Sequence, residues 1–254
     1  MLELGSVNIS IQNSIATIEF FHPAHNAMPG SQLTKLTEAV QNAGENDSVR
    51  VIVLKSEGDR TFCAGASFDE LASIKDFETG HRFFMGFANV INAMRKCPKF
   101  IIGRIQGKAV GGGVGLAAAT DYCIATDQAS VKLSELAVGI GPFVVGPAVE
   151  RKIGISAFTQ LAINATEWQS AEWAKDKGLY QEVFPTIEQM DAYISHLTEK
   201  LVLSNPDAMQ QLKQVFWQGT ENWEELLSAR AAMSGRLVLS DFTKKAIEAF
   251  KLKS

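Results

Sequence analysis

The chain has 254 residues, of which 46% are hydrophobic and 20% are charged, and its formal net charge is -4. A chain of this length and composition can bury a large core, so we expect an ordered protein and exclude disorder. Its charges are mixed in sign along the chain and form no basic stripe, which argues against binding to nucleic acid or anionic lipid.

The cysteines and histidines show no pattern that is typical of a metal site. Cys63, Cys97 and Cys123 are odd in number and have no CxxC spacing, so the sequence predicts neither a disulfide framework nor a zinc site. The first residues lack the basic and apolar regions of a signal peptide, and no run of about 18 apolar residues is present. We therefore expect a cytoplasmic protein without a membrane span and without a metal.

Predicted strands and helices alternate through the first part of the chain. Residues 7–11 and 15–20 alternate in polarity around Asn13 and Ser14, which is typical of an antiparallel hairpin. Helical spacing of apolar residues and short apolar runs then predict the following elements: helices over residues 30–43, 76–94 and 112–119, and strands over residues 51–55, 100–105, 122–125 and 131–133.

The last quarter of the chain has helical periodicity only. We expect this region to bury a face against another subunit rather than against the first part of the chain, with Trp217 and Trp223 among its apolar residues. The chain then divides into a core, residues 1–185, and a helical oligomerisation region, residues 186–254. The predicted helices cover residues 187–203, 206–217, 223–239 and 241–252.

A glycine run could present backbone N–H groups to a ligand. Gly111, Gly112 and Gly113 lie between an apolar strand and a helix, where glycine allows close approach and the helix dipole adds positive potential. A pair of N–H groups in such a place can form an oxyanion hole. Close packing of a helix on a strand is the alternative role for these glycines.

A second segment of small residues, 63–66, precedes a predicted helix that Ser67 or Asp69 could cap. Its backbone could also face a ligand. Cys63 could in principle act as a nucleophile, but no histidine is near it in sequence, and a small buried thiol is the commoner outcome.

The glycine run also fits a dinucleotide-binding fingerprint. Gly113, Gly115 and Ala118 match G-x-G-x-x-A, and Glu135 follows about 20 residues later. A predicted strand intervenes before Glu135, and no later strands complete a doubly wound sheet. A dinucleotide-dependent oxidoreductase is therefore the less favoured alternative.

Four segments in order resemble the crotonase (enoyl-CoA hydratase/isomerase) superfamily: FCAGA at 62–66, GKAVGGG at 107–113, DYCIA at 121–125 and LSEL at 133–136. The likeness covers residues 7 to 184, and the helical tail is similar to the family's trimerisation region. The resemblance implies an α/β, crotonase (ClpP-like) fold of repeated β-β-α units. It also implies an acyl-CoA thioester substrate, no separate cofactor because coenzyme A is part of the substrate, and a homotrimer or homohexamer.

The resemblance also implies roles for individual residues. In this family the N–H groups at the positions of Ala66 and Gly112 hold the thioester oxygen. Glu135 matches the second of two family glutamates, whereas Gly115 stands in place of the first. We therefore expect Glu135 to act alone as the acid/base, with a pKa raised by an apolar pocket, although a lone glutamate at a strand end is often only a surface group. The expected thioester contacts are Cys63, Ala64, Gly65, Ala66, Phe68, Gly111, Gly112, Pro142 and Phe143.

The resemblance also leads to expectations about the acyl pocket, two acidic residues and the end of the chain. Phe143 and Val144 are expected to narrow the acyl pocket, and Asp121 is expected to serve structure. Glu150 is expected to be a surface residue beside basic neighbours, with an approach to the pocket as the alternative. By family analogy, residues 250 and 251 would complete the CoA site of a neighbouring subunit.

The sequence does not separate the reactions of this family sharply. A single glutamate is typical of the isomerase branch, whereas GGGVGLAAA followed by LSE is similar to bacterial hydratases of branched enoyl thioesters. We expect an enoyl-CoA hydratase, possibly acting on 3-methylglutaconyl-CoA, with an enoyl-CoA delta-isomerase as the alternative. A non-catalytic protein that binds CoA thioesters is the alternative from another class.

Overall fold

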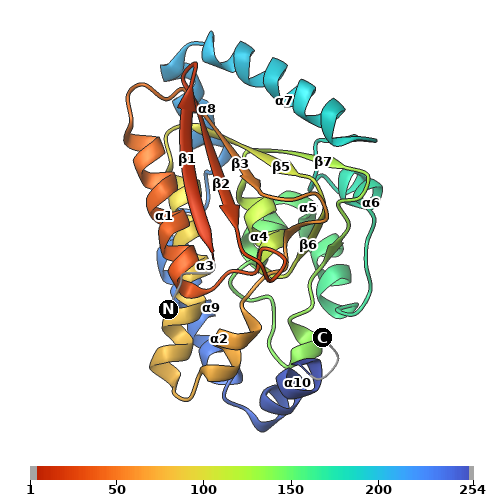
Figure 1. Ribbon diagram of the computed structural model, residues 1–254. Helices are drawn as coiled ribbons and strands as arrows, with labels where there is room; N and C mark the ends of the chain where they lie inside the picture. Colours follow the sequence, from red (N-terminus) through yellow and green to blue (C-terminus); the bar gives the residue numbers. More distant parts are fainter. Residues whose placement is uncertain (1–4, 252–254) are drawn as a thin grey trace.

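The computed structural model describes residues 5–251, without the side chains of residues 250 and 251, so the contacts expected for those two lie outside the described part. The main sheet has the strand order β1-β2-β3-β5-β7-β9 (Figure 1). β1 is antiparallel to β2, and every other neighbouring pair is parallel. Its strands are β1 (Ser6–Gln12), β2 (Ile15–Phe21), β3 (Val51–Ser56), β5 (Phe100–Ile105), β7 (Tyr122–Thr126) and β9 (Glu182–Phe184).

β1 and β2 form the predicted hairpin. The turn residues Asn13 and Ser14 have positive φ angles of 51° and 61°, as a tight connection between paired strands requires. β2 buries Ile18 and Phe20 on one face and leaves alternate residues partly exposed, which is the period of two expected for a strand. The hairpin prediction is confirmed, and β3, β5 and β7 end within one residue of their predicted bounds.

Helices cover both faces of the main sheet (Figure 1). One face shares the largest hydrophobic cluster with α1 (Gly30–Glu45), α3 (Phe77–Lys96), α4 (Gly112–Ala119) and α5 (Gly146–Ile163). On the other face, Met190 and Ile194 of α7 (Ile187–Val202) pack against strand residues that point away from the first cluster. The site described below lies on the side of the larger cluster.

The C-terminal region is helical, as predicted. After α7 come α8 (Pro206–Phe216), α9 (Trp223–Leu237) and α10 (Asp241–Lys251). Trp217 and Trp223, expected to face another subunit, are each only 6% exposed and pack edge to face within the chain's own core. That expectation is therefore wrong for these two side chains, because α9 packs along α3 of the same chain. The oligomeric state and the division between residues 185 and 186 stay predictions.

A buried ion pair fixes α8 to the sheet. Lys213 Nζ lies 2.8 Å from Asp121 Oδ2, and the two side chains are 3% and 4% exposed. Lys213 also donates to the carbonyl oxygen of Lys99, and Trp217 Nε1 donates to Asp121 Oδ1 at 2.8 Å. Asp121 Oδ2, the oxygen that faces Lys213, also accepts a hydrogen bond from the N–H of Ile101. Asp121 thus has the structural surroundings expected of it.

The structure adds elements that the sequence pattern did not predict, and all of them except α5 are short. β4 and β6 are three residues each, too short to show a periodicity, and with β8 they form a second, parallel sheet. Ser67 accepts the N–H of Glu70 at the start of α2, as the capping prediction allowed. The added elements are β4 (Thr61–Cys63), β6 (Lys108–Val110), α2 (Phe68–Ser73), a 3-10 helix (Leu136–Val138), α5 and α6 (Ala171–Asp176), and β8 is Val131–Lys132.

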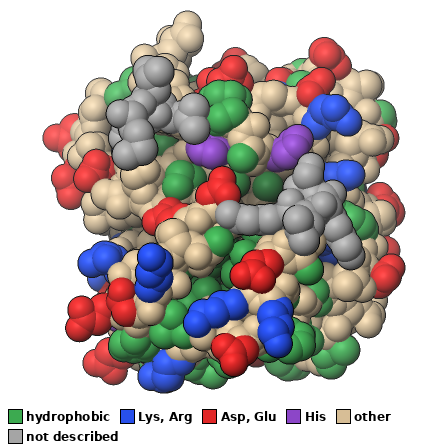
Figure 2. Space-filling model, turned by 60° about the horizontal axis from the view of Figure 1, so that its bottom comes forward, with side chains coloured by type: hydrophobic (Ala, Val, Ile, Leu, Met, Phe, Trp, Pro, Cys, Tyr) green, Lys and Arg blue, Asp and Glu red, His purple; other side chains and the backbone are tan. Residues whose placement is uncertain are grey.

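The surface carries charges of both signs. On the face in Figure 2, acidic and basic side chains are interspersed with apolar ones. Between residues 5 and 251, no helix is both long enough and apolar enough to cross a membrane.

Candidate active site

Three parallel strands bring the predicted segments to one place. β4 ends at Cys63, β6 at Val110 and β8 at Lys132, and each leads directly into one segment of interest. Because the strands are parallel, their carboxyl ends meet at one edge of the small sheet, which is where α/β proteins commonly bind ligands. The turn at 63–66, the glycine run and Glu135 therefore lie together although they are far apart in sequence.

The turn after β4 is held by a bridge to Met28. The N–H of Met28 donates to the carbonyl oxygen of Gly65 at 2.7 Å, and the N–H of Ser67 donates to that of Met28 at 3.2 Å. The N–H of Ala66 takes no part in this bridge. Gly65 has a φ of +87°, and a Cβ there would lie 2.8 Å from the carbonyl oxygen of Val110, so the close approach requires glycine.

The glycine run turns β6 into α4. Gly111 has a φ of +51°, and its N–H donates to the carbonyl oxygen of Lys132 at 2.8 Å. Gly112 is the first residue of α4, so its N–H has no acceptor within the helix and lies at the positive end of the helix dipole. A Cβ built on Gly65 would lie 3.4 Å from the nitrogen of Gly112, which shows that the two segments are adjacent. Backbone donors from both segments thus border one space.

Glu135 places a carboxyl group beside these donors. Its Oε1 lies 3.0 Å from the position that a Cβ on Gly111 would occupy. Its Oε2 is buried and has no hydrogen-bond partner among residues 5–251. Burial raises the pKa of Glu135 from 4.5 to about 7, because the apolar surroundings disfavour the charged form. A carboxyl group with this pKa can both take and give a proton near neutral pH.

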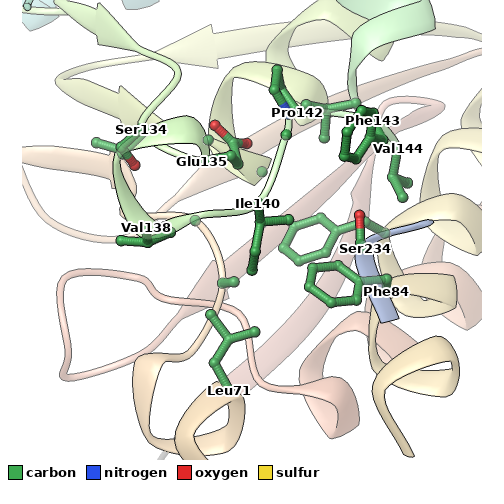
Figure 3. A pocket seen from close by; sticks show the side chains of 18 of the residues that line it. Leu71, Phe84, Ser134, Glu135, Val138, Ile140, Pro142, Phe143, Val144 and Ser234 are labelled. Carbon is green, nitrogen blue, oxygen red and sulfur yellow. The ribbon is translucent and has the colours of Figure 1, made fainter. Parts of the chain in front are cut away.

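These groups line one pocket, which is shown in Figure 3. Nearly all of the predicted site residues contribute to its wall. They are Ala64, Gly65, Ala66, Phe68, Gly111, Gly112, Glu135, Pro142 and Phe143, together with Val144.

Cys63 is the exception among the predicted contacts. It is absent from the wall of the pocket, and its side chain is fully buried. Its Sγ accepts a weak hydrogen bond from the N–H of Gly65 at 3.4 Å, and burial raises the pKa of the thiol to about 12. Such a thiol is protonated near neutral pH and is no nucleophile.

Other wall residues come from segments that the sequence analysis did not connect with the site. Leu71 of α2, Phe84 and Phe87 of α3 and Ser234 of α9 line the pocket. Ile140 joins them from the loop that also holds Phe143. In Figure 3, Ser134 and Glu135 lie at one side, Ile140 in the middle, and Phe84, Phe143, Val144 and Ser234 at the other side.

Ser234 reaches the pocket because α9 lies very close to α3. A Cβ on Gly80 of α3 would lie 3.0 Å from the carbonyl oxygen of Gly235 of α9. The small residues around Ser234 and the glycine in α3 are a signal for close helix packing. They do not reveal which two helices meet.

Val145 occupies the space beside Gly115, the residue that stands where the resemblance places the first of two glutamates. A Cβ on Gly115 would overlap the side chain of Val145, which lies just before α5. Gly115 is buried within α4, and Val145 lines the pocket. The space that a longer side chain at residue 115 would need is therefore occupied.

Glu150 lies away from the site. It is exposed on α5 and borders a different surface hollow, together with Arg151 and Thr220. Its expected surface position is confirmed. Within the described range 5–251, no group of three or more His, Cys, Asp or Glu side chains is arranged to hold a metal ion.

The chain is similar to known proteins over most of its length. A family model described as Enoyl-CoA hydratase/isomerase matches residues 10–254. The mitochondrial methylglutaconyl-CoA hydratase of Mus musculus is 32% identical over 200 residues, which cover 77% of this chain and 63% of that protein. The peroxisomal Delta(3,5)-Delta(2,4)-dienoyl-CoA isomerase of Arabidopsis thaliana is 27% identical, with 98% of this chain and 94% of that protein covered.

The same fold occurs in a solved structure. The crystal structure of enoyl-CoA hydratase from Bacillus halodurans superimposes with a TM-score of 0.88, over 96% of this chain and 99% of that one, at 22% identity. At this identity the likeness shows the fold alone. The crotonase fold predicted from the sequence is thereby confirmed.

Proposed function

Because the chain belongs to the enoyl-CoA hydratase/isomerase family of the crotonase superfamily, we propose that it hydrates a 2-enoyl-CoA thioester, with Glu135 as the acid/base. One observation carries the proposal. A buried carboxyl group with a pKa of about 7 shares a pocket with the backbone N–H groups of Ala66 and Gly112. This combination suits a reaction that moves a proton while negative charge develops on a carbonyl oxygen.

The two N–H groups would act as the oxyanion hole. As the substrate becomes an enolate, negative charge moves onto the thioester oxygen, and two hydrogen bonds and the dipole of α4 stabilise it. Loss of one such donor costs about 3 kcal/mol of transition-state stabilisation in measured cases. Gly65 and Gly111 have positive φ angles and no side chain, which would let the oxygen approach both donors.

Glu135 would handle the proton in both halves of the reaction. In its ionised form it takes a proton from water while the water oxygen bonds to the β-carbon and the π electrons move onto the thioester oxygen. The same carboxyl group then gives its proton to the α-carbon as the carbonyl re-forms. The net change is the addition of one water molecule, and both steps use only this chain and the thioester. We therefore propose that no further cofactor takes part.

Double-bond migration is the second candidate, and a specific observation favours it. Residue 115 is glycine, and Val145 fills the adjacent space, so the described part of the chain places no second carboxylate in the pocket to orient a water molecule. A single Glu135 can move a proton between the α- and γ-carbons of an enoyl thioester without any water. The relative from Arabidopsis thaliana is named as an isomerase of this general type.

The remaining wall of the site would bind the rest of the thioester. The backbone at Ala64 and Gly65 borders the pocket and would line the path of the pantetheine arm. Cys63 would support this turn from behind, since its side chain is buried. A homotrimer or homohexamer in the cytoplasm remains our expectation.

Mass spectrometry with the purified protein tests the proposal. The protein is incubated with saturated, 2-enoyl and 3-enoyl CoA thioesters, and products are read by mass and by ultraviolet absorbance. A gain of one water with a 2-enoyl substrate supports hydration, whereas a mass-neutral spectral change with a 3-enoyl substrate supports isomerisation. Binding of thioesters without any turnover would indicate a non-catalytic binding protein and would contradict both reactions.

A thermal-shift measurement tests the oxidoreductase alternative. Stabilisation by a nicotinamide dinucleotide, and none by CoA thioesters, would favour that class. We expect the reverse pattern, because Glu135 lines the same pocket as Ala66 and Gly112, whose backbone donors suit a thioester oxygen.

A further inference from the structure

The pocket beyond the two backbone donors is apolar. Aromatic and aliphatic side chains from three separate segments make up this part of the wall. They are Leu71, Phe84, Phe87, Ile140, Phe143 and Val144. Most of this surface would therefore lie against the acyl group of a bound thioester.

Among the described side chains, those of residues 5–249, the polar ones in the wall are few and carry no positive charge. They are Ser134, Glu135 and Ser234, and no Lys, Arg or His of this range lines the pocket. Ser134 lies next to Glu135 in sequence, and Ser234 is 1% exposed at the other side of the pocket (Figure 3). Its neutral hydroxyl group can donate only one hydrogen bond.

We propose that this pocket accepts an uncharged, apolar acyl group and discriminates against an acyl group that ends in a carboxylate. The inference rests on the proposed function, since it assigns the apolar part of the pocket to the acyl group. It departs from the substrate expected from sequence, because 3-methylglutaconyl-CoA carries a free carboxylate on its acyl chain.

Desolvation is the physical reason. An ionised carboxylate that leaves water must find a cation or several hydrogen-bond donors, and a wall of phenylalanine, leucine and isoleucine provides neither. Ser234 would replace only one of the water molecules that solvate the carboxylate. Glu135 adds a second acidic group to the same pocket, and two negative charges at short range oppose each other.

A matched pair of saturated thioesters tests this selectivity. Pentanoyl-CoA and glutaryl-CoA have acyl chains of equal carbon number and differ in a terminal methyl group against a terminal carboxylate. Isothermal titration should give a dissociation constant for pentanoyl-CoA at least about a hundredfold lower than that for glutaryl-CoA. The methyl ester of glutaryl-CoA controls for size and should bind more tightly than glutaryl-CoA itself.

A variant pair checks that the acyl pocket sets the preference. Phe143→Arg places a cation in the wall, and Phe143→Met changes the shape without a charge. We expect Phe143→Arg to reduce the preference for pentanoyl-CoA at least about tenfold relative to Phe143→Met. An equal reduction in both variants would show that charge at this wall does not set the preference.

The outcomes separate this inference from the proposed function. Equal affinities for the two thioesters in the unmodified protein, or tighter binding of glutaryl-CoA, would overturn the inference. Saturated thioesters undergo no proton transfer to a double bond, so a preserved preference without turnover of any enoyl thioester would contradict the proposed function and leave this inference standing. Failure to bind either thioester would contradict both.

Discussion

Replacing Glu135 with glutamine should separate the chemical role of this residue from its effect on stability. The substitution keeps the size of the side chain and removes its ability to transfer a proton. We expect kcat to fall at least about a hundredfold, with little change in the dissociation constant of a saturated thioester. An unchanged kcat would refute the assignment.

The same substitution should stabilise the protein, and the effect should depend on pH. Glu135 has a pKa of about 7 in the folded chain against 4.5 as its ordinary value. Between these values the unfolded chain loses the proton and the folded chain keeps it, so the wild-type stability falls as pH rises through about 7. The pKa difference corresponds to about 3 kcal/mol, as an upper limit because water in the pocket would solvate the carboxylate.

Urea unfolding at pH 5 and pH 8.5 measures this effect. Glutamine stays neutral at both values, so the free energy of unfolding of the variant relative to wild type should rise by up to about 2.5 kcal/mol from the lower pH to the higher one. Any cost of burying the amide cancels in this difference. The same relative stability at both pH values would show that the carboxyl group is not desolvated, and the argument for its raised pKa would fail.

Three further substitutions test the backbone donors, the acyl pocket and the buried ion pair. Gly112→Ala should lower kcat/KM about a hundredfold, because the added methyl group would overlap the Phe87 ring and displace the donor; steady-state rates like those of wild type would contradict this. Phe143→Ala should raise kcat/KM for octenoyl-CoA relative to butenoyl-CoA, and an unaltered chain-length profile would show that Phe143 does not limit the pocket. Lys213→Met should lower the free energy of unfolding by about 3–5 kcal/mol, because Asp121 would remain buried without its cation; a loss below about 1 kcal/mol in urea titration would argue against that.

Most of the long helices were predictable from sequence because each shows its own periodicity, but α5 (Gly146–Ile163) was not predicted. β5 and α4 have the predicted bounds, since a short apolar run and a stretch of small residues are each bounded by glycine or a break in the pattern. Three-residue strands carry no such signal. β4 and β6 are identified in the structure by their hydrogen-bonded pairing, β4 with β6 and β6 with β8.

The site was predictable where local motifs define it and unpredictable where distant segments complete it. Glu135 and the two glycine segments were found from the residues around them, and they line the same pocket. Ser234 lies about a hundred residues later in a helix whose neighbours are set by tertiary packing. The burial of Trp217 within the chain was missed for the same reason, since an apolar residue on a helix does not indicate which surface will cover it.

The contact between Gly115 and Val145 has a consequence for how this chain could diverge. A glutamate introduced at residue 115 alone would meet the Val145 side chain, so that single change would be disfavoured by steric overlap. A smaller residue at 145 would have to come first, although on its own it would only open a small cavity. The two positions are thus epistatic, and the order of substitutions is constrained. A lineage with the present pair of residues would tend to keep its single carboxylate.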